Sequence, residues 1–341
     1  MSLISLIFLL PRKQAAGVLR VHAFMLLFVL FLQVVVQANA FAVEKDSAIS
    51  VDLIKGKTAI QKPSDSLDTR LQTLKSNKGT ASTIRTPIIT GPISYKILHS
   101  EAQDPRLFVQ GLEISDQSLY ITSGRYGLSA LFKESIDETI RRQDRDLVHR
   151  FHASIFAEGL SIANNHIYVL SWRSQKGFVF DKNFGKVGEF SYPHEGWGIA
   201  HEKTTSENAK QFIVSDGTST LRRYLSTDIS TFDEIERFTV SYKGASLTHL
   251  NELELVDDLL FINQFGSHAI IVYDLKNYRT IGFMDLSKLS KKHKRLQRRN
   301  PDAVLNGIAY DPRHKALWVT GKLWPKRYLI KPEFTTSHDH F

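Results

Sequence analysis

The chain has 341 residues, of which 42% are hydrophobic and 23% are charged, a composition typical of a folded protein with one large or two ordinary domains. It contains no cysteine, which excludes disulfide bonds, thiolate metal sites and a cysteine nucleophile. The formal charge of +9 is spread along the chain and does not indicate a nucleic-acid-binding protein. The one dense basic run, KKHKRLQRRN (291–300), is interpreted as a solvated loop.

Residues 1–40 have the organisation of a secretory signal peptide. Three basic residues precede the apolar stretch AFMLLFVLFLQVVV (23–36), and an Ala-x-Ala pattern ends at Ala40. The apolar stretch is shorter than the roughly 20 residues that span a bilayer, which favours a cleaved signal over an uncleaved anchor. We therefore expect a secreted or periplasmic protein with no stable membrane association.

Residues 41–92 are rich in Ser, Thr, Lys and Asp and show no sustained hydrophobic period. Such a segment does not contain enough apolar surface to form a core, and we predict a largely flexible linker. A short helical stretch is compatible with SDSLDTRLQTLKS, but nothing in the pattern extends it.

From residue 93 onward, short apolar runs alternate with polar turns, and one phrase recurs five times. Each copy has a polar or aromatic residue, then Gly (once Glu), then Leu or Ile, and an apolar run follows. The copies begin at Gln110, Glu158, Trp197, Asn251 and Asn306, which are 48, 39, 54 and 55 residues apart. Three or four short strands per unit of this length are typical of the blade of a β-propeller.

We therefore predict an all-β fold, a five-bladed β-propeller over residues 93–331 followed by a tail at 332–341. The last unit has only three strands before Pro332. The strand PISYKILHSE (92–101) precedes the first unit and has no partner in it. We expect this strand to complete the last blade, because pairing the two ends closes the ring and protects both edges.

In a propeller the first strand of each blade lines the central channel, so the five residues that begin the copies should converge at one mouth. The glycine that follows them lets adjacent inner strands approach closely. The ends of the next strands should form a second ring, which contains Trp172, Asp216, Phe265 and Lys322. Of these, Asp216 is interpreted as a turn residue, and Asn306 of the first ring as a hydrogen-bonding residue between blades.

Eight stretches carry a family resemblance: FVQG, FAEGLS, GFVFD, EGWGIA, SDGTSTL, LNELE, LNGIAYD and VTGKLWP. In this order they resemble the plant-type glutaminyl cyclases, five-bladed propeller enzymes, and the resemblance covers about residues 93–331. It implies a glutaminyl-peptide cyclotransferase, in which the α-amine of an N-terminal glutamine attacks its own γ-carboxamide, ammonia leaves and pyroglutamate remains. It also implies that no cofactor and no catalytic metal is needed. We expect a monomer whose substrates are peptides or proteins with N-terminal glutamine.

The resemblance also assigns roles to residues. Glu158 matches the family's essential glutamate, and we predict that it takes a proton from the amine and returns it to the leaving ammonia. Phe156 supplies apolar surroundings that raise the pKa of this carboxyl. Asn251 and Lys322 are the predicted catalytic donors to the amide oxygen. The other predicted substrate-binding residues are Phe108, Gln110, Trp172, Trp197 and Phe265.

Two other functions remain open at this point. Calcium-dependent propeller hydrolases of the lactonase type also gather Glu, Asn and Asp around a channel, and loss of activity in a chelator would favour that class. A propeller used only as a binding module is the second alternative. The sequence departs from the family pattern at Phe265, which stands where tryptophan is common and leaves a smaller wall, and also in FVQG and in GASLTHLNELE.

The signal peptide generates the first testable prediction. N-terminal sequencing of the exported protein is expected to begin at Phe41, because the Ala-x-Ala pattern ends immediately before it. An intact Met1 in a membrane fraction would contradict this expectation and favour the uncleaved anchor.

Overall fold

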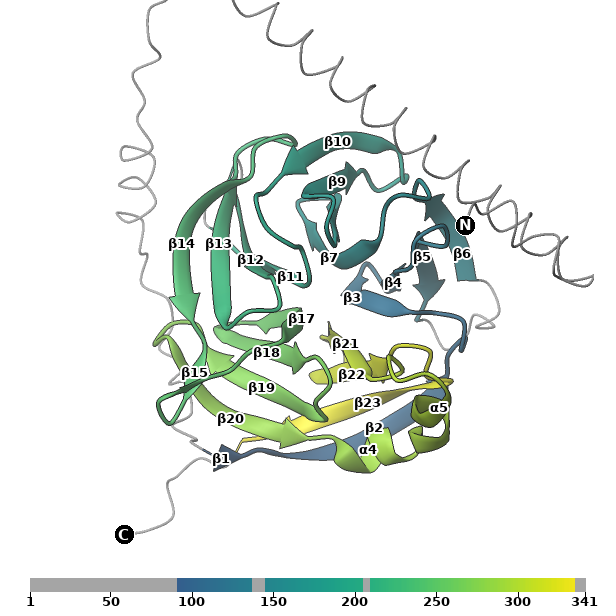
Figure 1. Ribbon diagram of the computed structural model, residues 1–341, viewed down its shortest axis with the longest axis vertical. Helices are drawn as coiled ribbons and strands as arrows, with labels where there is room; N and C mark the ends of the chain where they lie inside the picture. Colours follow the sequence, from purple (N-terminus) through teal and green to yellow (C-terminus); the bar gives the residue numbers. More distant parts are fainter. Residues whose placement is uncertain (1–90, 137–144, 205–208, 335–341) are drawn as a thin grey trace, which may run out of the picture. The chain divides into compact units, whose positions relative to one another are not determined.

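A computed structural model describes residues 91–136, 145–204 and 209–334, and over these residues the chain forms the predicted five-bladed β-propeller (Figure 1). Five antiparallel sheets surround a central channel. The innermost strand of every sheet comes first within its blade, and each inner strand contacts those of the two neighbouring blades. The predicted signal peptide and nearly all of the predicted linker lie outside the described residues.

Each of blades 1 to 4 is built from strands that follow one another in the sequence. Blade 1 contains β3 (Val109–Ser115), β4 (Ser118–Ser123), β5 (Ala130–Ser135) and β6 (Arg145–Arg150). Blade 2 contains β7 (Ala157–Ala163), β8 (His166–Ser171), β9 (Lys176–Phe180) and β10 (Lys186–Ser191). Blade 3 contains β11 (Ile199–Glu202), β12 (Lys210–Ser215), β13 (Thr220–Ser226) and β14 (Asp233–Thr239). Blade 4 contains β17 (Leu250–Val256), β18 (Leu259–Gln264), β19 (Ala269–Asp274) and β20 (Arg279–Asp285).

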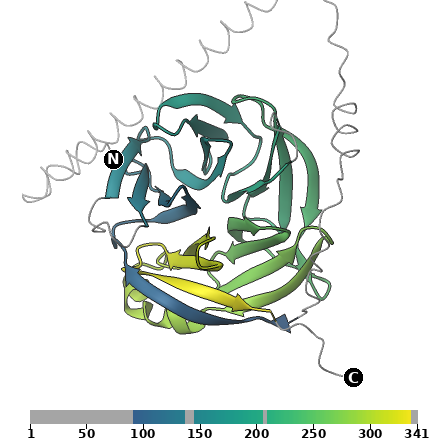
Figure 2. The same cartoon turned by 180° about the vertical axis from the view of Figure 1, so that it is seen from behind.

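Blade 5 joins the two ends of the propeller, as predicted. Its inner strands are β21 (Leu305–Asp311), β22 (Ala316–Gly321) and β23 (Lys326–Glu333), and its outer strand is β2 (Ser94–Ala102). The strand β2 pairs antiparallel with β23 along its whole length (Figure 2). The pairing leaves neither end of the chain as an open inner edge, which protects the ring against pairing with other chains.

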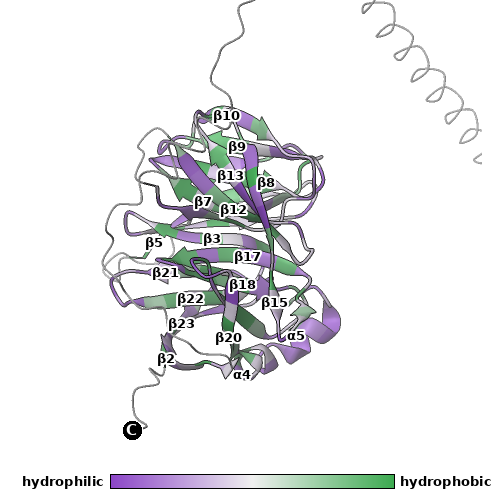
Figure 3. Ribbon diagram, turned by 90° about the vertical axis from the view of Figure 1, so that its left-hand side faces the viewer, coloured by the Kyte–Doolittle hydropathy of each residue, from purple (hydrophilic) through white to green (hydrophobic). Residues whose placement is uncertain are grey.

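Several elements between and beside the blades were not predicted. The short strand β1 (Gly91–Pro92) adds a parallel fifth strand to β20, and β15 (Ser241–Tyr242) and β16 (Ala245–Ser246) form a hairpin after blade 3. The basic run interpreted as a loop instead contributes to two short helices, α4 (Ser287–Lys291) and α5 (Lys294–Arg299). The helix α5 buries no residue and is strongly hydrophilic (Figure 3), but His293 of the same run is buried and stacks on Trp324, so the run is solvated only in part.

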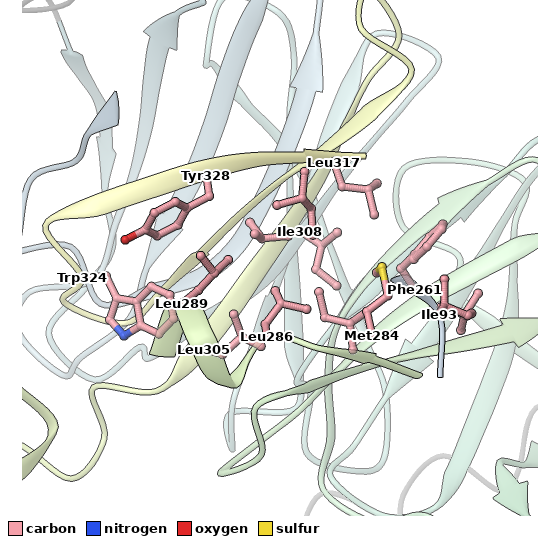
Figure 4. Packing of buried hydrophobic residues seen from close by; sticks show 14 of the residues in the cluster. Ile93, Phe261, Met284, Leu286, Leu289, Leu305, Ile308, Leu317, Trp324 and Tyr328 are labelled. Atoms are coloured by element: carbon pink, nitrogen blue, oxygen red, sulfur yellow. The ribbon is translucent and has the colours of Figure 1, made fainter. Parts of the chain in front are cut away.

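The largest hydrophobic cluster lies between blades 4 and 5 and explains why α4 forms at this place (Figure 4). Leu286 and Leu289, at the start of and within α4, are fully buried there beside Trp324 and Tyr328 of blade 5. Burying one such side chain contributes about 1.5–3 kcal/mol, so the two leucines together offset much of the cost of ordering this turn, which is about 1–2 kcal/mol per residue. The helix therefore caps the gap between two blades.

The glycines of the recurring phrase are required by the close approach of the inner strands, as predicted. A Cβ at Gly159 would lie 2.7 Å from the carbonyl oxygen of Trp197, and one at Gly198 would lie 2.2 Å from that of Asn251. Real Cβ atoms do not approach backbone this closely, so a larger residue would push the blades apart. The exception is the fourth copy, in which Glu252 occupies this position.

Glu252 belongs to a group of three carboxyl groups in the channel with Glu113 and Glu254. Its two oxygens accept the backbone N–H groups of Ile308 (2.8 Å) and Leu112 (3.3 Å), which belong to blades 5 and 1. Glu113 and Glu254 each accept one N–H from the next blade, at 3.1 and 2.9 Å. By exposed surface Glu252 is buried and Glu113 and Glu254 are part-buried, and their low-dielectric surroundings raise the pKa of Glu113 to about 8 and those of the other two well above the usual carboxyl range.

This group makes stability depend on pH in a defined direction. A carboxyl whose pKa is raised by folding keeps its proton in the folded state when the unfolded chain has already lost it, so stability falls as pH rises from about 4.3 through the folded pKa. We expect the melting temperature to fall between pH 5 and 9. Glu113→Gln should flatten the fall, because the amide still accepts the backbone hydrogen bond but cannot ionise.

Asp233→Asn, at the exposed start of β14, is the matched control and should leave the slope unchanged. Melting curves recorded by calorimetry across this pH range provide the measurement. Equal slopes for the wild type and Glu113→Gln would show that Glu113 is ionised in both the folded and the unfolded state.

Candidate active site

A cavity of about 310 Å³ lies where the inner strands begin. It is lined by Phe108, Gln110, Phe156, Glu158, Trp172, Trp197, Asn251, Phe265, Asp302 and Lys322. The structure thus brings all nine side chains predicted from the sequence together in one place, and adds Asp302 from the loop between α5 and β21. Their roles in a reaction are taken up below as proposals.

The two predicted rings are visible in the way the strands deliver these side chains. Gln110, Glu158 and Asn251 lie near the starts of inner strands, whereas Trp172 and Lys322 directly follow the second strands of their blades. Two members of the predicted rings do not line the cavity. Asp216 accepts the backbone N–H of Thr218 and pairs with Arg222 at 2.9 Å, and Asn306 donates to the carbonyl oxygen of Val109 in the next blade at 3.0 Å.

Glu158 is buried among apolar walls and is held by one hydrogen bond. Gln110 donates from Nε2 to Glu158 Oε1 at 2.7 Å. Burial raises the pKa of the Glu158 carboxyl well above its usual range; the nearby Lys322 opposes this rise and the Glu195 carboxylate adds to it. A carboxyl with a raised pKa is able to exchange its proton with a bound amine near neutral pH.

Lys322 is the cationic group of the cavity. Its Nζ lies 4.9 Å from the ring centroid of Phe108 and 5.1 Å from that of Phe265, so two aromatic faces cover it. Burial lowers the pKa of the Lys322 ammonium, while the carboxylates of Glu158 and Asp302 act in the opposite direction. The aromatic walls therefore contribute to the electrostatics of the site as well as to its shape.

Two amide oxygens in the cavity have no protein partner among the described residues. Gln110 Oε1 and Asn251 Oδ1 are both buried and accept no hydrogen bond. A buried acceptor without a donor costs about 1–3 kcal/mol, so such atoms are normally satisfied by water or by a ligand. Because both side chains line the cavity, these oxygens are available to accept N–H groups of a bound molecule.

Glu195 organises two walls of the cavity and was missed by the sequence reasoning. Its Oε2 accepts the indole N–H groups of Trp172 (2.8 Å) and Trp197 (3.0 Å), and its Oε1 pairs with Arg173 at 3.0 Å. Burial alone would raise its pKa, but the hydrogen bonds from the two indoles and the arginine outweigh burial and lower it. The quoted EGWG contains this residue, yet no spacing rule connects it with Trp172.

The family model described as glutamine cyclotransferase matches residues 71–332. The chain belongs to the glutamine cyclotransferase family. A curated glutaminyl-peptide cyclotransferase from Arabidopsis thaliana is 34% identical over 231 residues, which cover 67% of this chain and 68% of that protein. The crystal structure of the Myxococcus xanthus glutaminyl cyclase superposes with a TM-score of 0.61 at 23% identity, and covers 73% of this chain and all of that one.

The family and the class of enzyme predicted from the sequence are therefore confirmed, and the five-bladed fold of this glutamine cyclotransferase agrees with the solved bacterial structure. Membership argues against the calcium-dependent hydrolase and the binding module as alternatives. The part of the chain that the structure describes has no group of three or more His, Cys, Asp or Glu residues placed to hold a metal ion. Within the same residues, no helix is long and apolar enough to cross a membrane.

The indole contacts of this glutamine cyclotransferase generate a prediction. Glu195→Leu leaves two indole N–H groups without an acceptor, and we expect a loss of about 1–3 kcal/mol in stability together with easier quenching of tryptophan fluorescence by acrylamide. Trp318 and Trp324 are buried elsewhere and should not contribute to the change.

Glu189→Leu, on the outer strand of blade 2, is the matched control, because it removes an exposed carboxylate and its ion pair with Lys186 and leaves both indole hydrogen bonds in place. It should behave almost as the wild type, since an exposed ion pair contributes at most about 1 kcal/mol. Unchanged quenching in Glu195→Leu would mean that packing alone holds the two indoles.

Proposed function

We propose that this chain is a glutaminyl-peptide cyclotransferase that converts the N-terminal glutamine of peptides and proteins to pyroglutamate at the cavity described above, with Glu158 as its acid and base. The observation that carries the proposal is this fully buried carboxyl, which faces a cavity among aromatic walls and has a raised pKa. A cavity of about 310 Å³ is at the small end of ligand pockets, which suits one side chain folded back on its own amine.

The reaction requires a proton to move twice. The neutral α-amine nitrogen attacks the γ-carbonyl carbon and forms a new C–N bond, and Glu158 as carboxylate accepts the proton that this nitrogen releases. The tetrahedral intermediate then loses its original C–N bond, and Glu158 returns the proton to the leaving ammonia. The raised pKa of Glu158 suits both steps, because it brings the proton affinity of the carboxyl toward that of an α-amine, which is about 7.7–8.0.

The remaining polar groups suit the charges that develop during the reaction. The amide oxygen becomes negative in the intermediate, and Asn251 Nδ2 and Lys322 Nζ are the donors that we assign to it. The free oxygens of Gln110 and Asn251 accept N–H groups of the substrate and so orient it. The aromatic walls exclude water and favour the folded-back conformer, which contributes to the rate by proximity. These walls are Phe108, Phe156, Trp172, Trp197 and Phe265.

We further propose that the mature enzyme acts as a monomer outside the cytoplasm. The support for export is the signal-peptide pattern of residues 1–40. The support for a monomer is the closed ring, in which β2 already occupies the outer edge of the last blade.

Incubation of the purified protein with a peptide that begins with glutamine tests the activity, with ammonia release and the mass of the product as readouts. Glu158→Gln should lower the turnover number by a factor of about 100 to 10,000, because the amide cannot accept the proton of the amine. Its melting temperature should stay close to that of the wild type, and KM should change much less than kcat.

Trp197→Ala is the contrasting variant. It removes contact area that the substrate uses equally in the ground state and in the transition state, so it should mainly raise KM. Turnover by Glu158→Gln at a near wild-type rate would show that this carboxyl is structural and that the acid and base must be sought elsewhere.

A further inference from the structure

A second cavity, of about 600 Å³, adjoins the active-site cavity. It is lined by Asp104, Pro105, Arg106, Leu107, Ser123, Gly124, Arg125, Leu128, Phe132, Arg150 and Leu323. Two of these residues are chain neighbours of active-site residues, because Leu107 precedes Phe108 and Leu323 follows Lys322. Gly124 belongs to the wall between the cavities: a Cβ there would lie 2.2 Å from a ring carbon of Phe156 and 2.9 Å from Cγ of Gln110.

Arg125 connects the two cavities electrostatically. Its guanidinium carbon lies 4.7 Å from the ring centroid of Phe108, the same ring that Lys322 approaches at 4.9 Å. The backbone of Arg125 has φ +124°, a conformation that costs free energy for any residue other than glycine. Strain of this kind persists only where the surroundings compensate for it, and the strained residue here is a cation that lines the second cavity and contacts a wall of the first.

The charges of the second cavity are unbalanced. Arg106 and Asp104 form a pair through several hydrogen bonds, the shortest at 2.7 Å, and their charges cancel. Arg125 and Arg150 have no carboxylate partner within the described residues. The cavity therefore presents two guanidinium groups, which suit the planar geometry of a carboxylate.

The loop between β4 and β5 adds an apolar edge to this place. Tyr126 is 52% exposed and Leu128 is 61% exposed, so this loop presents apolar surface to a ligand. The ring of Tyr126 lies 5.4 Å from that of Phe156, which lines the active-site cavity. One short loop thus offers a cation, an aromatic ring and an aliphatic side chain beside the cavity that holds Glu158.

We propose that the second cavity binds the residues that follow the N-terminal glutamine, and that Arg125 and Arg150 receive a carboxylate at the second or third position of the peptide. This inference rests on the proposed function, because it assumes that the glutamine occupies the first cavity. A peptide advances at most about 3.3–3.6 Å per residue, so the residues that directly follow a buried glutamine stay close to the first cavity, and the second cavity shares with it the wall at Gly124. The carboxylate belongs to an Asp or Glu side chain or to the C-terminus of a short peptide.

A series of matched peptides tests whether the enzyme prefers substrates with a carboxylate after the N-terminal glutamine. The series contains Gln-Glu-Ala-Ala, Gln-Ala-Glu-Ala and Gln-Lys-Ala-Ala, all amidated at the C-terminus, and Gln-Ala with a free or an amidated C-terminus. For the wild type we expect kcat/KM to be about five- to tenfold higher for a peptide with a carboxylate than for its lysine or amidated counterpart, mainly through KM. The difference should shrink in high salt.

The double variant Arg125→Gln, Arg150→Gln should reduce this ratio to nearly one and keep turnover of the amidated Gln-Ala. Arg237→Gln, on the exposed outer strand of blade 3, is the matched control and should keep the ratio of the wild type. If kcat/KM is higher only for Gln-Ala with a free C-terminus, the two arginines bind the C-terminal carboxylate of short peptides. If kcat/KM is higher for the peptides that contain Glu, they bind acidic side chains. Both outcomes support the site.

The inference and the proposed function fail in different ways. If the wild type cyclises every peptide with equal efficiency, the second cavity does not select a carboxylate, although the enzyme is a cyclase. If it cyclises none, the proposed function is wrong. Calorimetric binding of pyroglutamyl peptides with Glu or Lys in second position then still measures the preference, and equal affinities would overturn the inference without any turnover.

Discussion

The contact between neighbouring inner strands is the constraint on which the rest of the molecule depends. The backbone N–H of Gly159 donates to the carbonyl oxygen of Trp197 at 2.7 Å, and no Cβ fits at this point. Because the strands are in contact here, the side chains one residue earlier in the phrase are held side by side. The backbone positions of Glu158 and Trp197 are therefore fixed by contacts between the strands, which gives the carboxyl the rigidity that its proposed role as acid and base requires.

The buried carboxyl groups differ in what satisfies them, and this difference separates structure from chemistry. Glu252 accepts backbone N–H groups from two other blades, and in the channel it joins blades that have no covalent link there. Glu158 has the same burial but is held by the side chain of Gln110, and it lines a cavity. Burial raises the pKa of both. A carboxyl whose oxygens accept backbone N–H groups has a structural role and links the blades. One that faces a cavity is able to exchange a proton with a ligand.

The walls of the active-site cavity are connected to each other as well as to a ligand. Glu195 holds the indoles of Trp172 and Trp197 from behind, and its charge also raises the pKa of Glu158. The ring of Phe108 is contacted by two cations, Lys322 and Arg125. The site is thus set up before a substrate arrives, since both aromatic walls and charges are held by groups outside the cavity.

The sequence by itself determined the number of blades, because a repeated phrase marks every inner strand. It also determined the closure of the ring, because a strand without a partner precedes the first repeat unit. The same phrase, together with the family resemblance, was sufficient to predict the nine cavity residues, since each occupies a fixed position relative to its own strand. The tertiary structure alone decided that Glu195 links Trp172 to Trp197, that Asp302 reaches the cavity and that Arg125 lies over Phe108. These contacts join loops of different blades, or a loop and a wall of the cavity. The distances between such loops depend on how the blades pack, and the repeated phrase contains no information about that packing.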